Sequence, residues 1–158
     1  MKTLFLLRHA KAVPAENGLR DSDRSLSNQG QEQAERVGKY LQKQNARFDL
    51  VLSSTALRAR QTTEIVLTAA GCVTEVCYEQ RIYEASRQQL LEVVSEIEMD
   101  KTKVLLVGHN PGMEELLQSL TGRSEGMAPG SLAEINLNAP EWSGAADQKG
   151  NLDGLVKP

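Results

Sequence analysis

The feature that most constrains the fold is the alternation of short apolar runs with segments of helical period along most of the chain. Residues 2–7 (KTLFLL) and 103–107 (KVLLV) are nearly continuous apolar runs, as expected of central strands covered on both faces. Residues 49–52 and 73–78 are weaker strand candidates. Residues 132–137 (LAEINL) alternate apolar and polar side chains, which is typical of a half-solvated strand near an edge. This order predicts βαβ units and a mainly parallel sheet.

Four helices are expected between these runs. The first covers about residues 27–44 and the second about 56–70, each with an apolar stripe at helical spacing. The third opens at Ser86, where the sequence S-R-Q-Q forms a capping box. The fourth opens with Asn110 as the N-cap and Pro111 at the first helical position. The chain is therefore predicted to form an α/β three-layer sandwich, with helices on both faces of a mainly parallel central sheet.

Length and charge narrow the classes of function. The 158 residues suffice for one domain with its own core, residues 1–158, without a metal or a disulfide to hold it together. The 18 basic and 21 acidic side chains give a net charge of −3. A nucleic-acid or anionic-membrane surface needs a basic field over a whole face, so we expect neither partner. Any anion that the chain binds must be small and held locally.

The two ends of the chain lead to further expectations. Residues 1–7 are too short for the apolar region of a signal peptide, and no apolar stretch approaches the length of a membrane span. We therefore expect a cytoplasmic protein in which Cys72 and Cys77 stay reduced. In the C-terminal tail, Trp142 is expected to pack onto the domain, and residues 152–157 are expected to add a final strand.

The chain has only two histidines and two cysteines, too few for an ordinary zinc site, so we expect neither a metal nor another cofactor. Both histidines stand directly after the strongest strand candidates. Arg8 and His9 follow the run at 2–7, and His109 follows the run at 103–107 after one glycine. Ligands of open α/β sheets bind outside the carboxyl ends of the strands. These three residues are therefore expected to meet at one edge of the sheet.

A third segment adds another arginine. Arg58 lies in residues 53–62 (SSTALRARQT), which run from a strand candidate into a helix. A cation in the first helical turn opposes the helix dipole, so an anionic ligand would explain its position, while Arg60 fits a solvated helix face. Asn110 begins the next helix directly after His109, and free backbone N–H groups there are expected to point to the same region. Taken singly, each residue also fits a surface loop, a core histidine or a solvated face. Their joint placement predicts a pocket for a small anion, and phosphate suits the fork of donors on a guanidinium.

Four segments, in this order along the chain, resemble the histidine phosphatase superfamily, which has the phosphoglycerate mutase-like fold. They are residues 6–12 (LLRHAKA), 24–30 (RSLSNQG), 53–62 and 107–111 (VGHNP). The similarity covers roughly residues 1–137 and is greater to the short SixA-like branch, whose members are phosphohistidine phosphatases. The resemblance thus implies a three-layer α/β fold and a phosphatase activity.

The same resemblance implies roles for individual residues. His9 is expected to be the nucleophile that accepts the phosphoryl group. Arg8, Arg58 and His109 are expected to complete the phosphate pocket, with Asn110 as a further substrate contact.

The proton donor and the substrate are the points where this chain departs from most of the superfamily. Ala10 stands where most members have glycine, and the long insertion that covers the site in mutases and acid phosphatases is absent. Glu84 is the best candidate acid, although it also fits a solvated loop residue. A phosphate ester expels an alkoxide that must be protonated, whereas protonated phosphohistidine expels neutral imidazole. The weak acid candidate and the missing insertion favour a phosphohistidine-bearing protein as substrate. A phosphomonoesterase for small phosphorylated substrates and a non-catalytic phosphohistidine-binding module are the alternatives.

Overall fold

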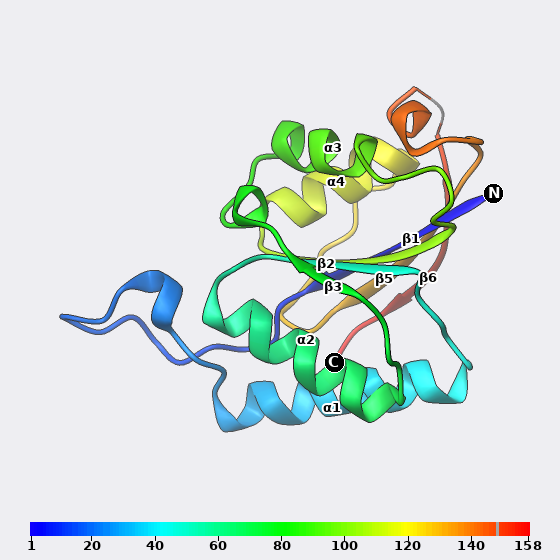
Figure 1. Ribbon diagram of the computed structural model, residues 1–158. Coiled ribbons are helices and arrows are strands. Elements are labelled where there is room, and N and C mark those ends of the chain that lie inside the picture. The colour runs from blue at the N-terminus through cyan, green and yellow to red at the C-terminus, as the bar shows by residue number, and fades with distance from the viewer. Residues whose placement is uncertain (148) are drawn as a thin grey trace.

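A mixed sheet forms the centre of the computed structural model, which describes residues 1–147 and 149–158 (Figure 1). Within these residues the sheet has six strands in the order β3-β2-β4-β1-β5-β6. The strands are β1 (Lys2–Arg8), β2 (Leu50–Ser53), β3 (Val76–Tyr78), β4 (Lys103–Gly108), β5 (Leu132–Leu137) and β6 (Asn151–Val156). β1, β2, β3 and β4 pair in parallel, and β5 is antiparallel to both β1 and β6. The mainly parallel sheet predicted from the sequence is confirmed.

Helices cover both faces of this sheet (Figure 1). α1 (Asn28–Lys43) and α2 (Leu57–Ala70) lie on one face, and α3 (Arg87–Ser95) and α4 (Gly112–Thr121) lie on the other. Short 3-10 turns occur at η1 (Asp21–Asp23), η2 (Gln80–Ile82) and η3 (Trp142–Gly144). No helix among the described residues is both long and apolar enough to cross a membrane. The predicted three-layer α/β sandwich is confirmed.

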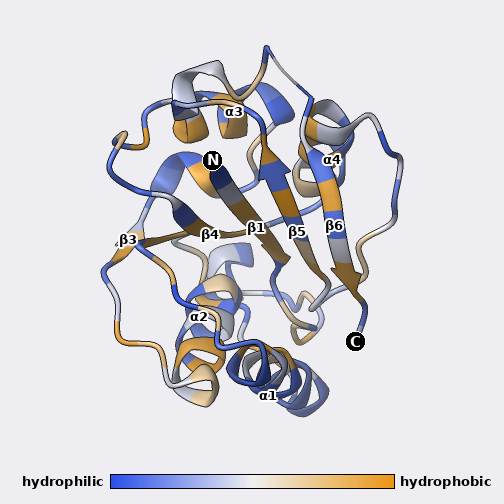
Figure 2. Ribbon diagram, turned by 90° about the vertical axis from the view of Figure 1, so that its right-hand side faces the viewer, coloured by the Kyte–Doolittle hydropathy of each residue, from blue (hydrophilic) through white to orange (hydrophobic). Residues whose placement is uncertain are grey.

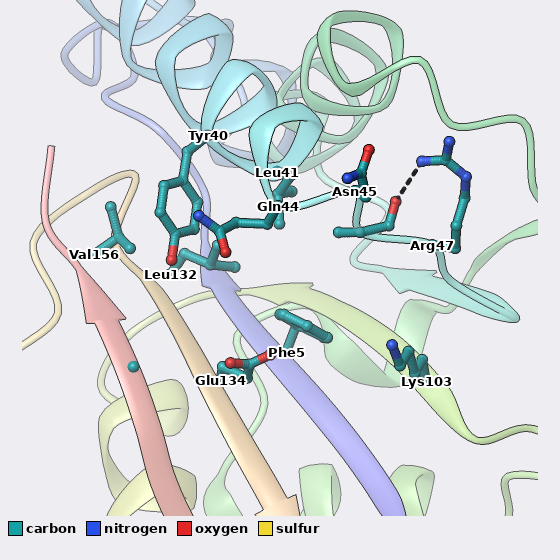
Figure 3. Close-up of a pocket in the computed structure, with 12 residues that line it drawn as sticks. Phe5, Tyr40, Leu41, Gln44, Asn45, Arg47, Lys103, Leu132, Glu134 and Val156 are labelled. Atoms are coloured by element: carbon teal, nitrogen blue, oxygen red, sulfur yellow. Dashed lines mark hydrogen bonds between the residues drawn. The ribbon is translucent and has the colours of Figure 1, made fainter.

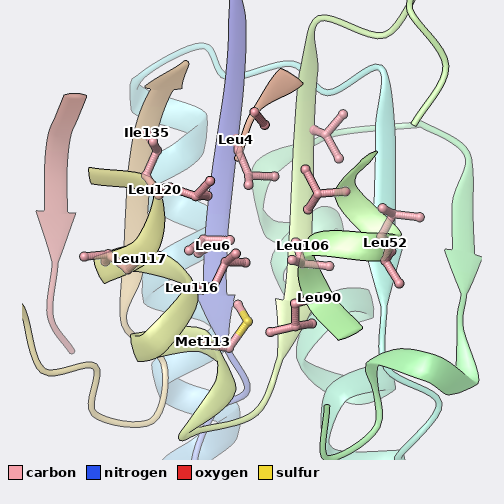
Figure 4. Close-up of a cluster of buried hydrophobic side chains, with 14 of the residues drawn as sticks. Leu4, Leu6, Leu52, Leu90, Leu106, Met113, Leu116, Leu117, Leu120 and Ile135 are labelled. Atoms are coloured by element: carbon pink, nitrogen blue, oxygen red, sulfur yellow. The ribbon is translucent and has the colours of Figure 1, made fainter. Parts of the chain in front are cut away.

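The apolar run of β1 serves both cores because successive side chains of a strand point to opposite faces. Leu4 and Leu6 contribute to the core under α3 and α4 (Figure 4), and Phe5 and Leu7 contribute to the core under α1 and α2. All four side chains are buried. Coloured by hydropathy, β1 and β4 are mainly hydrophobic, while the side of α1 turned away from the sheet is hydrophilic (Figure 2). Burial on both faces explains why these strands are apolar without alternation.

The starts of α1 and α3 follow the capping signals of the local sequence, and the start of α4 departs from its prediction. Ser27 caps α1 by accepting the N–H of Gly30, and Ser86 forms the predicted capping box at α3. The prediction for α4 is wrong by one residue, because Pro111 is the N-cap and the helix begins at Gly112. The chain turns at Asn110 and Pro111 before the helical hydrogen bonds start.

The two edge strands, β3 and β6, can be compared with the strands predicted from the sequence. β3 is shorter than the strand predicted at 73–78, because Val73 is fully exposed and only Val76–Tyr78 pair with β2. Cys72 and Cys77, around this strand, are free thiols. In the tail, Trp142 is buried and its indole N–H donates to the Lys101 carbonyl at 2.7 Å. The final strand predicted near 152–157 is present as β6.

The connections leave a crevice between β1 and β4. The chain turns from β1 to α1 on one face of the sheet, and from β4 to α4 on the other (Figure 1). Neighbouring parallel strands whose connections leave on opposite faces open a crevice at their carboxyl ends. Because Arg8 pairs with Gly108 in the parallel register, the residues that follow, His9 and His109, emerge side by side there.

A small cavity of about 120 Å³ lies elsewhere, between the C-terminal end of α1 and the sheet (Figure 3). Tyr40 of α1 and Gln44, the C-cap of this helix, form part of its wall, and Phe5 and Glu134 line it from the strands. Neither histidine belongs to its lining. The residues that carry the predicted chemistry therefore lie in the crevice and not in this cavity.

The two helices of one face approach closely at Gly38 of α1. A Cβ atom at this position would lie 2.5 Å from the Cβ of Ala69 and 2.7 Å from the carbonyl oxygen of Val66. Helix propensity alone favours alanine over glycine by about 1 kcal/mol. We nevertheless expect Gly38→Ala to lower the free energy of unfolding by about 1–3 kcal/mol, because α2 must move away from its packed position.

Urea denaturation measures this change. Gly154→Ala is the control, since a Cβ at this position in β6 meets no atom within 4 Å. We expect the control to stay within about 0.5 kcal/mol of the parent protein. A Gly38→Ala protein that is more stable than the parent would show that propensity, and not helix packing, dominates at this position.

Candidate active site

The crevice brings the two histidines of the chain together. The ring centroids of His9 and His109 are 5.0 Å apart, and the rings are tilted by 58°. Their exposed fractions are 9% and 3%. The backbone N–H of His9 donates to the carbonyl of Gly108 at 3.0 Å, which continues the ladder between β1 and β4 past the end of the strands. Strand pairing therefore fixes the distance between the two rings.

His9 is held in one tautomer. Its Nδ1 lies 2.7 Å from the carbonyl oxygen of Ala10. A carbonyl oxygen only accepts, so Nδ1 carries the proton and Nε2 carries the lone pair. Burial lowers the pKa of His9 to about 4, and repulsion by the Arg58 and Arg8 guanidinium groups acts in the same direction. His9 is therefore a neutral imidazole near neutral pH, with a basic nitrogen at Nε2.

His109 is also neutral in the free protein. Burial lowers its pKa to about 3, with repulsion from His9 and Arg58 as further causes. Its Nε2 is 2.7 Å from the hydroxyl of Ser54. Its Nδ1 faces the Nη2 of Arg58 at 3.4 Å and a carboxylate oxygen of Glu84 at 3.7 Å. One ring nitrogen is thus anchored to the protein, while the other faces the charged groups of the crevice.

Arg58 is a buried cation, with 3% of its surface exposed, although it lies in the first turn of α2. Its Nη1 donates to the carbonyl of Asp21 at 2.8 Å. Its Nη2 donates to the carboxylates of Asp21 at 3.0 Å and Glu84 at 2.9 Å. A buried charge is tolerated when it is paired and hydrogen-bonded. In the free protein the anions that compensate Arg58 are carboxylates of the chain itself.

Glu84 contacts this arginine and does not point freely into solvent. Its backbone has a φ of +51°, in the left-handed region that residues other than glycine rarely adopt. Such a conformation costs on the order of 1 kcal/mol and is typical of functional sites. Its side chain remains 52% exposed, so it reaches Arg58 and His109 from the solvent side. Of the two interpretations that the sequence left open, the structure therefore favours a residue of the crevice.

Arg8, the last residue of β1, contributes a second guanidinium. Its Nη1 donates to the carbonyl of Met127 at 2.9 Å. Its Nε is buried, and no hydrogen-bond partner reaches it from the described residues. Burial lowers the pKa of Arg8, against an opposing effect of the Glu114 carboxylate. An unpaired buried N–H is costly, and an oxyanion beside Nε would remove that cost.

Asn110 is directed toward a neighbouring loop. Its Nδ2 donates to a carboxylate oxygen of Glu114 and to the carbonyl of Met127, both at 2.9 Å. Its Oδ1 accepts the backbone N–H of Glu114 at 3.3 Å, and the carbonyl of His109 accepts another N–H of the same turn, from Met113. The expectation that this helix start presents free donors to the crevice is therefore wrong at these positions. The local side chain and carbonyl already accept them.

Asp21 and Tyr83 were missed by the sequence analysis. The carboxylate of Asp21 accepts hydrogen bonds from the Tyr83 hydroxyl, from Arg24 at 3.0 Å and from Arg58. These donors, led by Tyr83, hold the pKa of Asp21 well below its usual range. The ring of Tyr83 also packs edge-on against His109, with centroids 5.5 Å apart. Both residues lie in connections whose path the sequence pattern does not reveal, so no sequence feature pointed to them.

Ser54 was missed although a sequence feature was present. It directly follows β2, and β2 pairs with β4, so the rule that placed His109 also places Ser54 at the same edge. Arg60, in contrast, stands apart from the crevice. Its guanidinium lies 4.0 Å over the ring of Tyr78 in β3.

The assembled site combines two guanidinium groups with two neutral imidazoles. We call Arg8, His9, Arg58 and His109 the anion pocket. Within the described part of the chain, no group of three or more His, Cys, Asp or Glu side chains is placed to hold a metal ion. The pocket offers several N–H donors to a small oxyanion and a basic nitrogen that can attack its central atom.

Comparison with known proteins agrees with this chemistry. The chain matches the model of the histidine phosphatase superfamily (branch 1) over residues 4–90. The uncharacterized protein MT1313 of Mycobacterium tuberculosis is 34% identical over 125 residues, which cover 77% of this chain and 76% of that protein.

Two solved structures are similar over nearly the whole chain. A protein from Nakamurella multipartitia, assigned as phosphohistidine phosphatase SixA, has a TM-score of 0.88 at 28% identity and covers 99% of this chain and 96% of its own. A protein from Agrobacterium tumefaciens with the same assignment has a TM-score of 0.87 at 31% identity, with 99% and 98% covered. The phosphoglycerate mutase-like fold implied by the sequence is thus confirmed. With a family model that spans more than half of its length, the chain belongs to the histidine phosphatase superfamily and is a phosphatase.

Proposed function

We propose that this chain hydrolyses phosphoryl groups through a covalent phosphohistidine on His9, and that its substrate is a phosphohistidine-bearing protein. The observation that carries the proposal is the 2.7 Å contact between Nδ1 of His9 and the Ala10 carbonyl. This contact leaves the lone pair on Nε2, and the low pKa keeps His9 unprotonated. A histidine that acts as a nucleophile needs both properties.

In the first step, Nε2 of His9 attacks phosphorus in line with the leaving group. The new N–P bond forms as the bond from phosphorus to the substrate nitrogen breaks, and the electron pair of that bond goes to the leaving imidazole. Arg8 and Arg58 donate N–H groups to the phosphoryl oxygens, where charge redistributes in the transition state. The phosphorylated imidazole of His9 becomes cationic, and its Nδ1–H bond to the Ala10 carbonyl stabilises that charge.

His109 responds to the charge of the substrate. Its low pKa in the free protein comes from burial and neighbouring cations. A bound phosphoryl dianion acts in the opposite direction, because an opposite charge favours the protonated imidazole. The protonated His109 then donates from Nδ1 to a phosphoryl oxygen, while its Nε2 stays hydrogen-bonded to the Ser54 hydroxyl. In the second step, water attacks phosphorus, the N–P bond to His9 breaks, and inorganic phosphate leaves.

One structural observation, the chemistry of the leaving group and the similarity to known proteins support a protein substrate. The carboxylates on the solvent side of Arg58 are about half exposed, 47% for Asp21 and 52% for Glu84, so this side of the pocket is open. Protonated phosphohistidine leaves as neutral imidazole and needs no strong acid. The similarity to two proteins assigned as SixA supports the same substrate class.

A phosphomonoesterase for small molecules is the second candidate, and one observation favours it. The strained backbone of Glu84 brings its carboxylate to Arg58 and near His109, on the solvent side of the pocket. A carboxyl group there is suited to protonate an alkoxide leaving group. Turnover of a phosphohistidine-bearing phosphotransfer protein, compared with a panel of phosphate esters, separates the two candidates.

The nucleophile is tested by His9→Ala. We expect turnover to fall by about 10³-fold or more, with loss of the acid-labile, alkali-stable phosphoenzyme. Circular dichroism should show an intact fold, and binding of inorganic phosphate should persist because Arg8 and Arg58 remain. Full activity in this variant would rule out the covalent intermediate on His9.

The requirement for a neutral His9 also predicts how stability depends on pH. An unfolded chain protonates histidine at about pH 6.5. The folded chain resists protonation of His9 down to about pH 4 and of His109 down to about pH 3. Below about pH 6.5 the unfolded state therefore binds more protons, and the free energy of unfolding falls as the pH falls. Between about pH 6.5 and 5, each histidine is expected to contribute a slope of up to about 1.4 kcal/mol per pH unit.

Urea denaturation across this pH range measures the slope. His9→Asn removes one of the two titrating rings, so the contribution of the histidines should fall by about half. A variant whose slope equals that of the parent would mean that the pKa of His9 is not lowered by the fold.

The role of the carboxyl group is tested by Glu84→Gln. We expect hydrolysis of phosphohistidine protein to change by less than about tenfold, and hydrolysis of an alkyl phosphate to slow by about 10²–10⁴-fold. Glu98→Gln, at an exposed position in the connection between α3 and β4, controls for the loss of one negative charge. A loss of about 10³-fold on phosphohistidine would instead identify Glu84 as a necessary acid and point to ester substrates.

A further inference from the structure

Asp21 contacts Arg58 through both its backbone and its side chain. Its carbonyl oxygen accepts from Nη1 at 2.8 Å, and its carboxylate accepts from Nη2 at 3.0 Å. One residue therefore engages both terminal nitrogens of the guanidinium. Because the guanidinium is planar, two acceptors on different nitrogens fix its plane as well as its position.

The carboxylate of Asp21 is itself fixed by two further donors. The Tyr83 hydroxyl donates to it, and Nη1 of Arg24 donates at 3.0 Å. Arg24 is in turn held by the carbonyl of Val13 at 2.9 Å. Asp21 lies in η1, on the connection from β1 to α1 that extends beyond the rest of the molecule (blue in Figure 1). This projecting connection is thus tied to the pocket through a carboxylate held by three side chains.

Glu84 binds the same nitrogen of Arg58 but is held much more loosely. Only Oε1 of its carboxylate reaches Nη2 of Arg58, at 2.9 Å. The same oxygen lies 3.7 Å from Nδ1 of His109. The Glu84 side chain is about as exposed as that of Asp21, so the two carboxylates differ in the number of donors that hold them and not in their exposure. Of the two carboxylates on Arg58, Asp21 is built into a network and Glu84 is free to exchange.

We propose that Asp21 is the positioning residue of Arg58, holding the guanidinium in the plane that receives the phosphoryl group, while Glu84 is the partner that a phosphoryl oxygen replaces. The proposal rests on the proposed function, because it takes Arg58 as a ligand of the phosphoryl group. Asp21 acts only through Arg58 and need not touch the substrate.

A positioning role for Asp21 and simple electrostatics predict opposite changes in phosphate affinity when the carboxylate is removed. Removing a carboxylate close to an anion site reduces repulsion, so Coulomb's law alone predicts tighter binding of phosphate. Loss of a positioning residue predicts weaker binding, because the freed guanidinium must be ordered when the anion arrives. Asp21→Asn therefore separates the two effects by direction, and Glu84→Gln should follow the electrostatic direction.

Calorimetric titration of the full chain with inorganic phosphate provides the test. We expect Asp21→Asn to bind phosphate about tenfold more weakly, as for the loss of one charge-assisted hydrogen bond. Glu84→Gln should bind as tightly as the parent or up to a few-fold more tightly. Asp23→Asn is the matched control, since Asp23 lies in the same 3-10 turn and its carboxylate pairs with the exposed Arg20. The phosphate affinity of this variant should stay within about twofold of the parent, because the exposed pair that it removes does not involve Arg58.

A merely structural role for Asp21 would lower stability without changing the affinity of the folded protein, so urea denaturation accompanies each titration. Tyr83→Phe is the second variant should Asp21→Asn fail to fold. It removes one donor to Asp21 and leaves both contacts of Asp21 with Arg58, and we expect a loss of about threefold in affinity. Unchanged affinity in this variant would then count against the proposal.

The outcomes are distinguishable. Unchanged or tighter binding by Asp21→Asn, or an equal loss in Asp23→Asn, would overturn the positioning role while leaving the proposed function intact. A parent protein that binds no phosphate would overturn both. If the phosphoenzyme survives in His9→Ala while Asp21→Asn alone binds phosphate weakly, the covalent mechanism is wrong and the positioning role stands.

Discussion

The parallel pairing of β1 with β4 is the constraint on which the site depends. The register that joins Arg8 to Gly108 places the next residues of both strands at one edge, and the connections then leave on opposite faces. Two histidines far apart in the chain are thereby held with their rings 5.0 Å apart. Because both strands are buried on both faces, this geometry is maintained by the two hydrophobic cores and not by the polar residues themselves.

Burial of charge explains the electrostatic state of the pocket. The site excludes enough water to keep both imidazoles neutral, and it also buries Arg58. A buried guanidinium must be compensated at every stage. In the free protein, carboxylates of the chain fulfil this need, and in the proposed function a phosphoryl group takes over part of it during turnover. The same low-dielectric surroundings thus hold a neutral imidazole beside a fixed cation, which is the arrangement that the proposed phosphoryl transfer needs.

Much of the fold and of the pocket followed from local patterns. The apolar runs at 2–7 and 103–107 predict the central strands β1 and β4. The rule that ligands bind at the carboxyl ends of such strands then places Arg8, His9 and His109. The same rule applied to Ser54, which was overlooked. The start of α4 and the direction of the Asn110 side chain were not predictable, because they depend on which acceptors compete for the N–H groups of that turn. Asp21 and Tyr83 belong to connections, and connections carry no period from which their path can be derived.

The sequence by itself determined the α/β architecture, the family and the residues of the anion pocket, since periodicity and the order of residues around strand ends are local properties. Only the tertiary structure decided the tautomer of His9, the orientation of Arg58 and the place of Glu84 beside it. The positions of Arg58 and Glu84 depend on hydrogen bonds between segments that are distant in the chain. The charge of each histidine depends on burial, which shifts its pKa and cannot be inferred from the residue type alone.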